Sequence, residues 1–421
     1  MGGWRLIAAM ASTVLAVPAS AVAGPPLSQP EPDELPCPVA ELTDQPELPS
    51  PPAPPAHRPG DQELGGARLD TAGLVVPSGA PAVPGDLSAT SWLVADLDTG
   101  AVLGGCGPHQ HGIPASTQKL LLAAALLPEL DPDQVVEVTR KDVDIEPGSS
   151  AVGLVVGGEY PIETLWLGLL LNSGNDAANV LARVGGGEDG VEGGLRAMNE
   201  QAWRLGAYQT QAVTPSGLDG PGQFTSAYDL ALISRVLFDR SDFRRYVATE
   251  RVGIPAQPDQ NAPGFQIQNQ NDLLASYPGA LGGKTGFTDL ARHSFVGAAE
   301  QDGRRLVVTL LGAEVVPQPG WQQGAALLDW GFSLPADASV GRLVEPDELA
   351  ERATSSAGSP SPSPATGPGG GGPPGASAAT PAETISFTAV AGAALAAGGL
   401  VTLVTLLVTG RRRRGSGTVA R

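Results

Sequence analysis

The sequence predicts an α+β domain with a central antiparallel sheet of five strands flanked by helices. Three observations carry this prediction: two strand-like segments come first, a run of helix-like segments follows, and three more strand-like segments with a last helix end the folded part. Strands gathered at both ends of a helical stretch are typical of α+β domains. The unit spans residues 87–334, and its roughly 250 residues suffice for one domain with a sizeable core.

Each element has its own signal in the chain. The first two strands are expected at 89–97 and 101–104, on either side of the turn Asp98-Thr99-Gly100. Apolar periodicity predicts helices at 116–127, 162–171, 176–184, 195–205 and 226–238. The last strands are expected at 282–285, 294–299 and 305–311, with a turn at 301–303 between the final two. A helix at 321–330 should then return over the sheet.

The segments outside this domain are expected to export and anchor the chain. Residues 1–23 combine Arg5, an apolar stretch and a small-residue cleavage site, which is typical of a signal peptide. Residues 385–409 carry no charge, and as a helix they would span a hydrocarbon core about 30 Å thick. The four arginines 411–414 follow, so we expect a single-pass membrane protein whose folded domain is extracytoplasmic.

The remaining segments differ from the domain in composition. Residues 24–86 are expected to form a Pro-rich extracytoplasmic arm, extended and not a packed layer, and 335–384 a stalk rich in Pro, Ser and Gly. Residues 410–421 would be a basic cytoplasmic tail. Two other interpretations of 385–409 stay open, a buried Ala/Gly-rich helix and a cell-wall sorting signal, although 381–384 match Leu-Pro-x-Thr-Gly poorly.

Charge and cysteine content narrow the possible partners. The formal net charge is -19, which argues against nucleic acid because phosphate binding relies on clustered Lys and Arg. Cys37 and Cys106 are the two cysteines. In an exported chain we expect them to form a disulfide, the alternative being two small buried side chains.

Lysine is rare in this chain, and its positions indicate chemistry. Of 25 basic residues only Lys119, Lys141 and Lys284 are lysines. Lys119 closes a Ser-x-x-Lys motif that Ser116 opens. A serine hydroxyl needs a base to become a good nucleophile, and a desolvated lysine can be a neutral amine whereas arginine cannot. Three residues apart on a helix, the two side chains share a face, so we expect Lys119 to activate Ser116.

Two further motifs follow in order, Ser173-Gly174-Asn175 and Lys284-Thr285-Gly286. The set resembles that of the low-molecular-mass penicillin-binding proteins, the serine-type D-alanyl-D-alanine carboxypeptidases. The likeness includes 148–150, 216–218 and 283–289 and covers the folded unit. It implies a β-lactamase/DD-peptidase-like fold with an all-helical subdomain. It also implies an enzyme that removes the terminal D-alanine from peptidoglycan stem pentapeptides and is acylated by β-lactam antibiotics.

The resemblance assigns roles to individual residues. Ser116 would form the acyl-enzyme, Lys119 would take its proton, and Ser173 would relay a proton to the departing D-alanine. Asn175 would hydrogen-bond Lys119 or the substrate backbone. The substrate would be held by Lys284, Thr285, Gly286 and Phe287. Thr285 would bind the terminal carboxylate near Lys284, and the N–H groups of Ser116 and Phe287 would form the oxyanion hole.

Two departures from the family pattern stand out. The middle motif has Gly174 where β-lactamases have aspartate, and Arg292 stands where glycine is expected. Arg292 could assist carboxylate binding or have a structural role, and we favour the structural role. We expect neither metal nor cofactor, because no further ligand-type residues near His109 and His111 complete a coordination shell.

Two other functions are compatible with the fold. A serine β-lactamase of class A needs a glutamate after the middle motif for deacylation, and this chain has Gly217-Leu218-Asp219-Gly220 there instead of Glu-x-x-Leu-Asn. A catalytically silent wall-binding scaffold would be favoured by loss of Ser116 or Lys119, and both are present. The carboxypeptidase is therefore the leading hypothesis.

Overall fold

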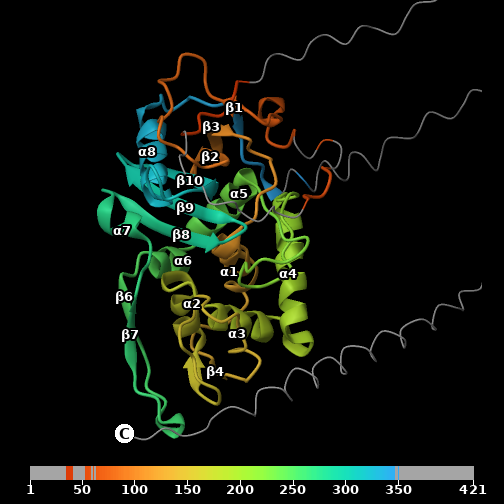
Figure 1. Cartoon of the computed structure of the whole chain (residues 1–421), viewed down its shortest axis with the longest axis vertical. Helices are drawn as coiled ribbons and strands as arrows, with labels where there is room; N and C mark the ends of the chain where they lie inside the picture. The colour runs from red at the N-terminus through yellow and green to blue at the C-terminus, as the bar shows by residue number, and fades with distance from the viewer. Residues whose placement is uncertain (1–34, 41–52, 58–59, 61–62, 347–348, 350–421) are drawn as a thin grey trace, which may run out of the picture. The chain divides into compact units, whose positions relative to one another are not determined.

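The computed structural model describes residues 35–40, 53–57, 60, 63–346 and 349, and Figure 1 shows the α+β domain that they form. An antiparallel sheet has the strand order β1-β3-β2-β10-β9-β8, with β11 also paired to β3. Its strands are β1 (Leu74–Val75), β2 (Ser91–Asp96), β3 (Ala101–Cys106), β8 (Ala280–Thr288), β9 (Arg292–Gln301), β10 (Arg304–Ala313) and β11 (Gly341–Arg342). The five expected strands are all present.

The sheet of the described residues has seven strands, two more than the five that the sequence predicts. Both additional strands, β1 and β11, are only two residues long and pair with β3. They provide partners for backbone groups of β3 that would otherwise form a sheet edge. Two residues contain no recognisable alternation of apolar and polar side chains, so neither strand has a sequence signal.

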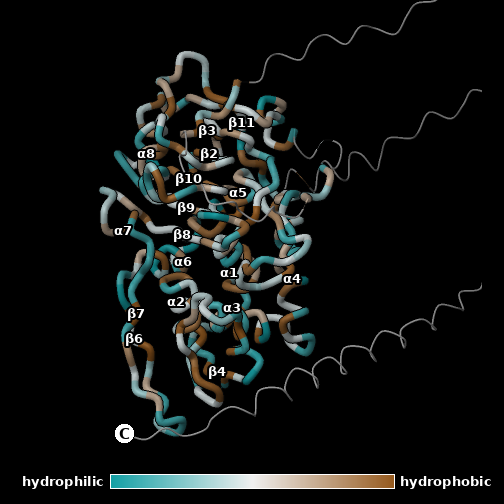
Figure 2. Tube along the Cα trace, viewed as in Figure 1, coloured by the Kyte–Doolittle hydropathy of each residue, from teal (hydrophilic) through white to brown (hydrophobic). Residues whose placement is uncertain are grey.

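Helices cover both faces of the sheet. On one face α8 (Gly320–Ser333) packs against β9 and β10, and on the other α5 (Ala227–Phe238) packs against β10 and β2. Trp92 of β2 belongs to the core layer under α8, whereas its neighbour Leu93 belongs to the layer with α5. The strand is therefore buried throughout, and Figure 2 shows how the hydrophobic residues follow these central elements.

The helical part lies beside β8 and β9 (Figure 1). Besides α5 it contains α1 (Lys119–Leu126), α2 (Ile162–Leu171), α3 (Asn175–Gly185), α4 (Gly190–Leu205), α6 (Ser241–Val247) and α7 (Asp272–Ser276). The described residues also form four 3-10 turns: η1 (Ala67–Leu69), η2 (Ala115–Gln118), η3 (Gly187–Asp189) and η4 (Pro258–Gln260). The helix expected at 116–127 thus begins as the 3-10 turn η2.

The expectation of an all-helical subdomain needs correction. Two small antiparallel pairs interrupt the helices: β4 (Val135–Glu137) with β5 (Glu159–Pro161), and β6 (Arg251–Ile254) with β7 (Phe265–Gln268). In Figure 1 the β6–β7 hairpin runs alongside the helical part. These strands have three or four residues each, which is too short for periodicity to separate them from loops.

The folded part is wider than the expected bounds of 87–334. Before it, Leu64, Leu69 and Val75 are buried in the core. After it, Val340 and Leu343 are buried next to β11. Pairing with β3 and burial of these apolar side chains fix both flanks to the domain, so the segment 63–86 is packed and is not a free arm.

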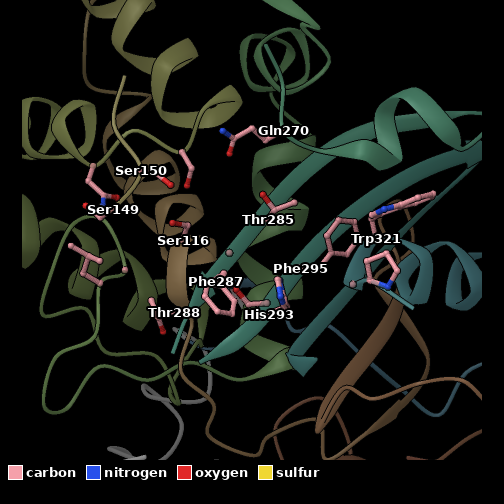
Figure 3. A pocket seen from close by; sticks show the side chains of 18 of the residues that line it. Ser116, Ser149, Ser150, Gln270, Thr285, Phe287, Thr288, His293, Phe295 and Trp321 are labelled. Atoms are coloured by element: carbon pink, nitrogen blue, oxygen red, sulfur yellow. The ribbon is translucent and has the colours of Figure 1, made fainter. Parts of the chain in front are cut away.

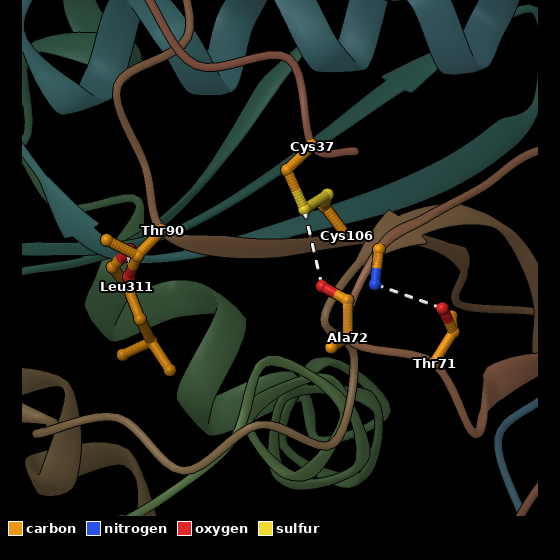
Figure 4. Close-up of a disulfide and its surroundings, with 7 residues drawn as sticks. Cys37, Thr71, Ala72, Thr90, Cys106 and Leu311 are labelled. Carbon is orange, nitrogen blue, oxygen red and sulfur yellow. Dashed lines mark hydrogen bonds between the residues drawn. A yellow bond between two sulfur atoms is a disulfide. The ribbon is translucent and has the colours of Figure 1, made fainter. Parts of the chain in front are cut away.

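The expected disulfide between Cys37 and Cys106 is confirmed (Figure 4). The two Cα atoms are 5.7 Å apart. Two backbone hydrogen bonds accompany the bond, one from Leu74 N to Leu35 O (2.7 Å) and one from Ala40 N to Leu87 O (2.7 Å). The short segment 35–40 is therefore fastened to the domain at three points.

The expected signal peptide (1–23), membrane helix (385–409) and basic tail (410–421) lie outside the described residues. Among the residues that are described, no helix combines the length and apolar character needed to cross a membrane.

Candidate active site

Ser116 lies on the turn η2, directly before α1. The preceding residue, Ala115, has a φ of 46°, in the left-handed region that few residues other than glycine adopt. Two hydroxyl groups hold this turn, because Thr117 Oγ1 and Ser294 Oγ of β9 each donate to Pro114 O at 2.6 Å. The strained turn is thereby fixed both within itself and to the sheet, and Ser116 faces the cavity described below.

Lys119 is fully buried one turn after Ser116. Its Nζ lies 2.9 Å from Ser116 Oγ, 2.8 Å from Asn175 Oδ1 and 2.6 Å from Ser216 O. The spacing of three residues therefore places the two side chains in contact, as expected from the sequence. The contact with Ser216 O was not foreseen, since nothing in the chain marks a carbonyl that lies 97 positions away.

The two buried lysines have depressed pKa values. Burial, followed by the positive charge of Lys284, holds the pKa of Lys119 well below its usual range. Burial also lowers the pKa of Lys284 to about 7. Lys284 is 2% exposed, and its Nζ donates to Thr285 O at 2.7 Å. Burial and the neighbouring charge thus shift Lys119 toward the neutral amine, and Lys284 is close to its titration midpoint at neutral pH.

The middle motif connects α2 to α3. Ser173 has a φ of 59° and is 4% exposed. Its Oγ has no hydrogen-bond partner among the residues that the structure describes. Asn175 is the first residue of α3 and directs its amide oxygen at Lys119. A buried, unpaired hydroxyl at this position is available to a ligand in the cavity.

The structure gives a steric reason for the departure at Gly174. A Cβ on this residue would lie 2.4 Å from Val152 Cγ2 and 2.8 Å from Asp176 Oδ1. The Asp176 carboxylate already accepts hydrogen bonds from the N–H groups of Val152, Gly153 and Leu154, at 2.8 to 3.0 Å. These bonds fasten the loop that carries Ser149 and Ser150, a role for Asp176 that no sequence motif indicates.

The third motif lies on β8, the edge strand of the sheet. Gly286 approaches the nucleophile turn so closely that a Cβ would lie 2.8 Å from Ser116 N and 2.3 Å from Ser294 Oγ. Only glycine fits without displacing the turn. Phe287 follows and is 48% exposed. At the end of the strand, Thr288 Oγ1 donates to Asp219 Oδ1 at 2.7 Å.

A cavity of about 430 Å³ brings the motifs together (Figure 3). Among the predicted residues, its lining includes Ser116, Ser173, Asn175, Thr285, Gly286 and Phe287. Lys119 and Lys284 lie buried behind it. Sequence reasoning missed the other end, which is lined by Gln270, Asp272, His293, Phe295, Pro319 and Trp321. These residues come from a hairpin end, a central strand and a helix start, none of which carries a motif.

Arg292 has a structural role, as a partner of Glu314. Its Nε and Nη2 donate to the two carboxylate oxygens of Glu314 at 2.7 and 2.9 Å. Its φ is 55°, which explains why glycine is the expected residue there. The guanidinium also lies 5.3 Å from the centre of the Phe287 ring. These contacts favour the structural role over carboxylate binding.

Comparisons with known proteins show which family the chain belongs to. The profile of the D-alanyl-D-alanine carboxypeptidase family matches residues 78–315. D-alanyl-D-alanine carboxypeptidase DacB2 of Mycobacterium tuberculosis is 44% identical over 274 residues, which cover 64% of this chain and 90% of the relative. DacD of Escherichia coli is 32% identical over 59% of this chain and 64% of its own length.

Solved structures give the same result. A crystal structure of D-alanyl-D-alanine carboxypeptidase from Mycobacterium tuberculosis has a TM-score of 0.59 and 44% identity, covering 64% of this chain and all of that one. A Streptomyces DD-transpeptidase has a TM-score of 0.57 and 26% identity, covering 61% and 99%. The chain therefore belongs to the D-alanyl-D-alanine carboxypeptidase family and is a serine hydrolase.

Proposed function

We propose that the protein removes the terminal D-alanine of peptidoglycan stem pentapeptides through an acyl-enzyme on Ser116. The contacts of the Lys119 amine carry the proposal. A neutral amine has two N–H bonds and one lone pair, and two of its neighbours, Asn175 Oδ1 and Ser216 O, can only accept. The lone pair is therefore left for the third neighbour, the Ser116 hydroxyl at 2.9 Å.

In the first step, Ser116 Oγ attacks the carbonyl carbon of the penultimate D-alanine and Lys119 takes the hydroxyl proton. The negative charge that develops on the carbonyl oxygen is stabilised by the N–H groups of Ser116 and Phe287. The close approach of Gly286 to Ser116 N supports this pairing, since it brings β8 next to the nucleophile turn.

In the second step, the peptide C–N bond breaks and the departing D-alanine nitrogen receives a proton. Ser173 relays that proton from Lys119, and its unpaired, buried Oγ in the cavity lining supports the role. Water then hydrolyses the ester and releases the shortened peptide. Asn175 orients Lys119 during both steps.

The terminal carboxylate is bound by Thr285 in the positive field of Lys284. Thr285 lines the cavity, and Lys284 is adjacent to it on β8. β-Lactam antibiotics use the same groups, because their ring carbonyl and carboxylate resemble those of the peptide. They are expected to acylate Ser116 and remain attached.

We also propose that the domain works outside the cytoplasm on a membrane anchor formed by residues 385–409. The charge-free stretch and the arginines 411–414 after it support this placement. Protease treatment of intact cells tests it: digestion of the domain with protection of a tag after residue 421 is expected, and protection of the domain would contradict it.

A time course of intact mass with benzylpenicillin tests the catalytic proposal. The full-length protein should gain one penicillin, mapped to Ser116, and keep it for far longer than the acylation takes. Ser116→Ala is the control and should gain none. An adduct that disappears with rapid drug hydrolysis would favour a β-lactamase, and the absence of any adduct would favour a silent scaffold.

A further inference from the structure

A second cavity, of about 460 Å³, lies outside the catalytic site. Its volume is within the range of about 300–1,000 Å³ that is usual for small-molecule sites. It is bounded by the C-terminal half of α4, by residues 207–211 after that helix, by residues just before α5 and by the N-terminal segment 53–57. No Asp, Glu, Lys or Arg is among the described residues that line it.

Five aromatic or imidazole rings of the described residues line it. Trp203 and Tyr208 have ring centroids 4.6 Å apart, and His111 lies 4.3 Å from His57 and 5.8 Å from Phe224. Trp203 is 53% exposed although it is a large aromatic residue. Burial, followed by the neighbouring His57, lowers the pKa of His111 to about 4, so this ring is uncharged at neutral pH.

One polar group in the lining lacks a partner. The Gln209 side chain is 2% exposed, and its Oε1 lies 3.1 Å from His109 Nδ1. Its Nε2 has no hydrogen-bond partner within the part of the chain that the structure describes. Within this part of the chain only one of the two terminal amide atoms of Gln209 is paired, so a ligand hydroxyl, which can donate as well as accept, would be stabilising at the other.

We propose that this cavity binds an uncharged saccharide, and specifically an N-acetylated glycan of the cell wall. Aromatic faces suit the apolar C–H face of a pyranose ring, and a carboxamide suits a sugar hydroxyl or an acetamido oxygen. The described lining offers no Lys or Arg to a phosphorylated or carboxylated ligand, whose charge would be costly to bury without a counter-ion. The choice of cell-wall glycan rests on the proposed function.

Segments that line the second cavity continue into the catalytic one. Gln211 and Gly222 line this cavity, whereas Gly217 and Leu218 in the loop between them line the catalytic one. His111 precedes Ser116 by five residues, and Gly112 exchanges two backbone hydrogen bonds with Thr225, at 2.8 and 2.9 Å. These backbone hydrogen bonds thus join a wall of the glycan site to the segment that leads to the nucleophile.

Calorimetric titration of the full-length protein with the peptide-free β-1,4 tetramer of N-acetylglucosamine tests the inference. The tetramer should bind, and Trp203→Ala should weaken its binding by about tenfold, since one aromatic stacking partner is lost. Alanine keeps the helix intact at this exposed position, and Trp203→Phe should retain most of the affinity. Phe265→Ala, at an exposed ring of β7, is the matched control and should bind the tetramer normally.

Acylation by benzylpenicillin separates this inference from the proposed function. Ser116→Ala should bind the tetramer and resist acylation, whereas Trp203→Ala should be acylated normally. Failure of the wild-type protein to bind the tetramer, or equal binding by Trp203→Ala, would overturn the inference even if acylation is normal. Binding of a peptide with the sequence of residues 51–57 in place of the tetramer would also overturn it, since the cavity would then be a seat for proline-rich chain.

Discussion

The two cavities of this domain differ most in their electrostatics. Behind the catalytic cavity lie two buried lysines, each with a lowered pKa. The described lining of the second cavity includes rings and amides but no Asp, Glu, Lys or Arg. Burying a cation costs free energy, so a protein retains one where its chemistry is needed. The contrast separates a site built for reaction from a site built for recognition, and changes in one should leave the other unaffected.

Lys119→Arg is expected to give the largest difference between its effect on acylation and its effect on tetramer binding. A guanidinium stays protonated and cannot accept the Ser116 proton, so acylation by benzylpenicillin should slow by a factor on the order of 10³. Binding of the N-acetylglucosamine tetramer should not change. Intact-mass time courses measure the rate, and thermal unfolding checks that the larger side chain has left the fold intact. Near-normal acylation in a folded variant would refute the role of the neutral amine.

Removal of the disulfide should affect the second cavity and leave the catalytic one working. Cys37→Ala removes a cross-link between residues 69 positions apart, which should lower the free energy of unfolding by about 2–4 kcal/mol. Because the segment 53–57 that lines the second cavity follows the tether, tetramer binding should weaken while acylation continues. Urea denaturation measures the stability, and the wild-type protein in reducing agent should behave like the variant. If the variant were as stable as the oxidised wild-type protein, the disulfide would add nothing to the stability of the fold.

The sequence predicts some contacts of the catalytic site far better than others. Ser116 and Lys119 are neighbours by local helical spacing, so their contact follows from the chain itself. The contacts of Lys119 with Asn175 and Ser216 join positions 56 and 97 residues apart. The first was expected only from the resemblance to a known family, and the second is a backbone carbonyl that no residue type marks.

The same distinction applies to the fold. Long apolar segments such as α2 and β10 were predicted within a few residues, because burial of one or both faces dictates their composition. The strands β1 and β11 were missed, since their pairing depends on the unsatisfied edge of β3 and not on their own residues. The second cavity combines rings from separate parts of the chain, so only the folded structure brings it into view.

Gly174→Asp tests why the middle motif departs from the β-lactamase pattern. The new side chain would collide with Val152 and place a second carboxylate next to Asp176. We expect a loss of about 1–3 kcal/mol in the free energy of unfolding, as for other overpacked sites. Acylation should also slow, because the loop fastened by Asp176 lines the catalytic cavity. Gly174→Ala is the control for steric effects alone, and unchanged stability of the aspartate variant would show that the loop can move aside.

The smallest expected effect comes from Lys284→Met and concerns pH. The positive charge of Lys284 makes protonation of Lys119 less favourable, so removing it should raise the Lys119 pKa. The amine would then be protonated, and lost as a base, at a higher pH. The acid limb of the acylation rate profile should move upward by about one pH unit.

The pKa of Lys284 determines where this difference is visible. With a pKa of about 7, Lys284 is charged in acidic solution and mostly neutral well above pH 7. The profiles of the variant and the wild-type protein should therefore diverge below pH 7 and become parallel at alkaline pH. Methionine keeps the length of the side chain without a buried charge. Loss of carboxylate binding by the charged Lys284 would lower the rate mainly below pH 7, so the pH midpoint of the acid limb is compared and not its height. A limb that stays in place, or moves to lower pH, would mean that Lys284 does not set the protonation state of the catalytic amine.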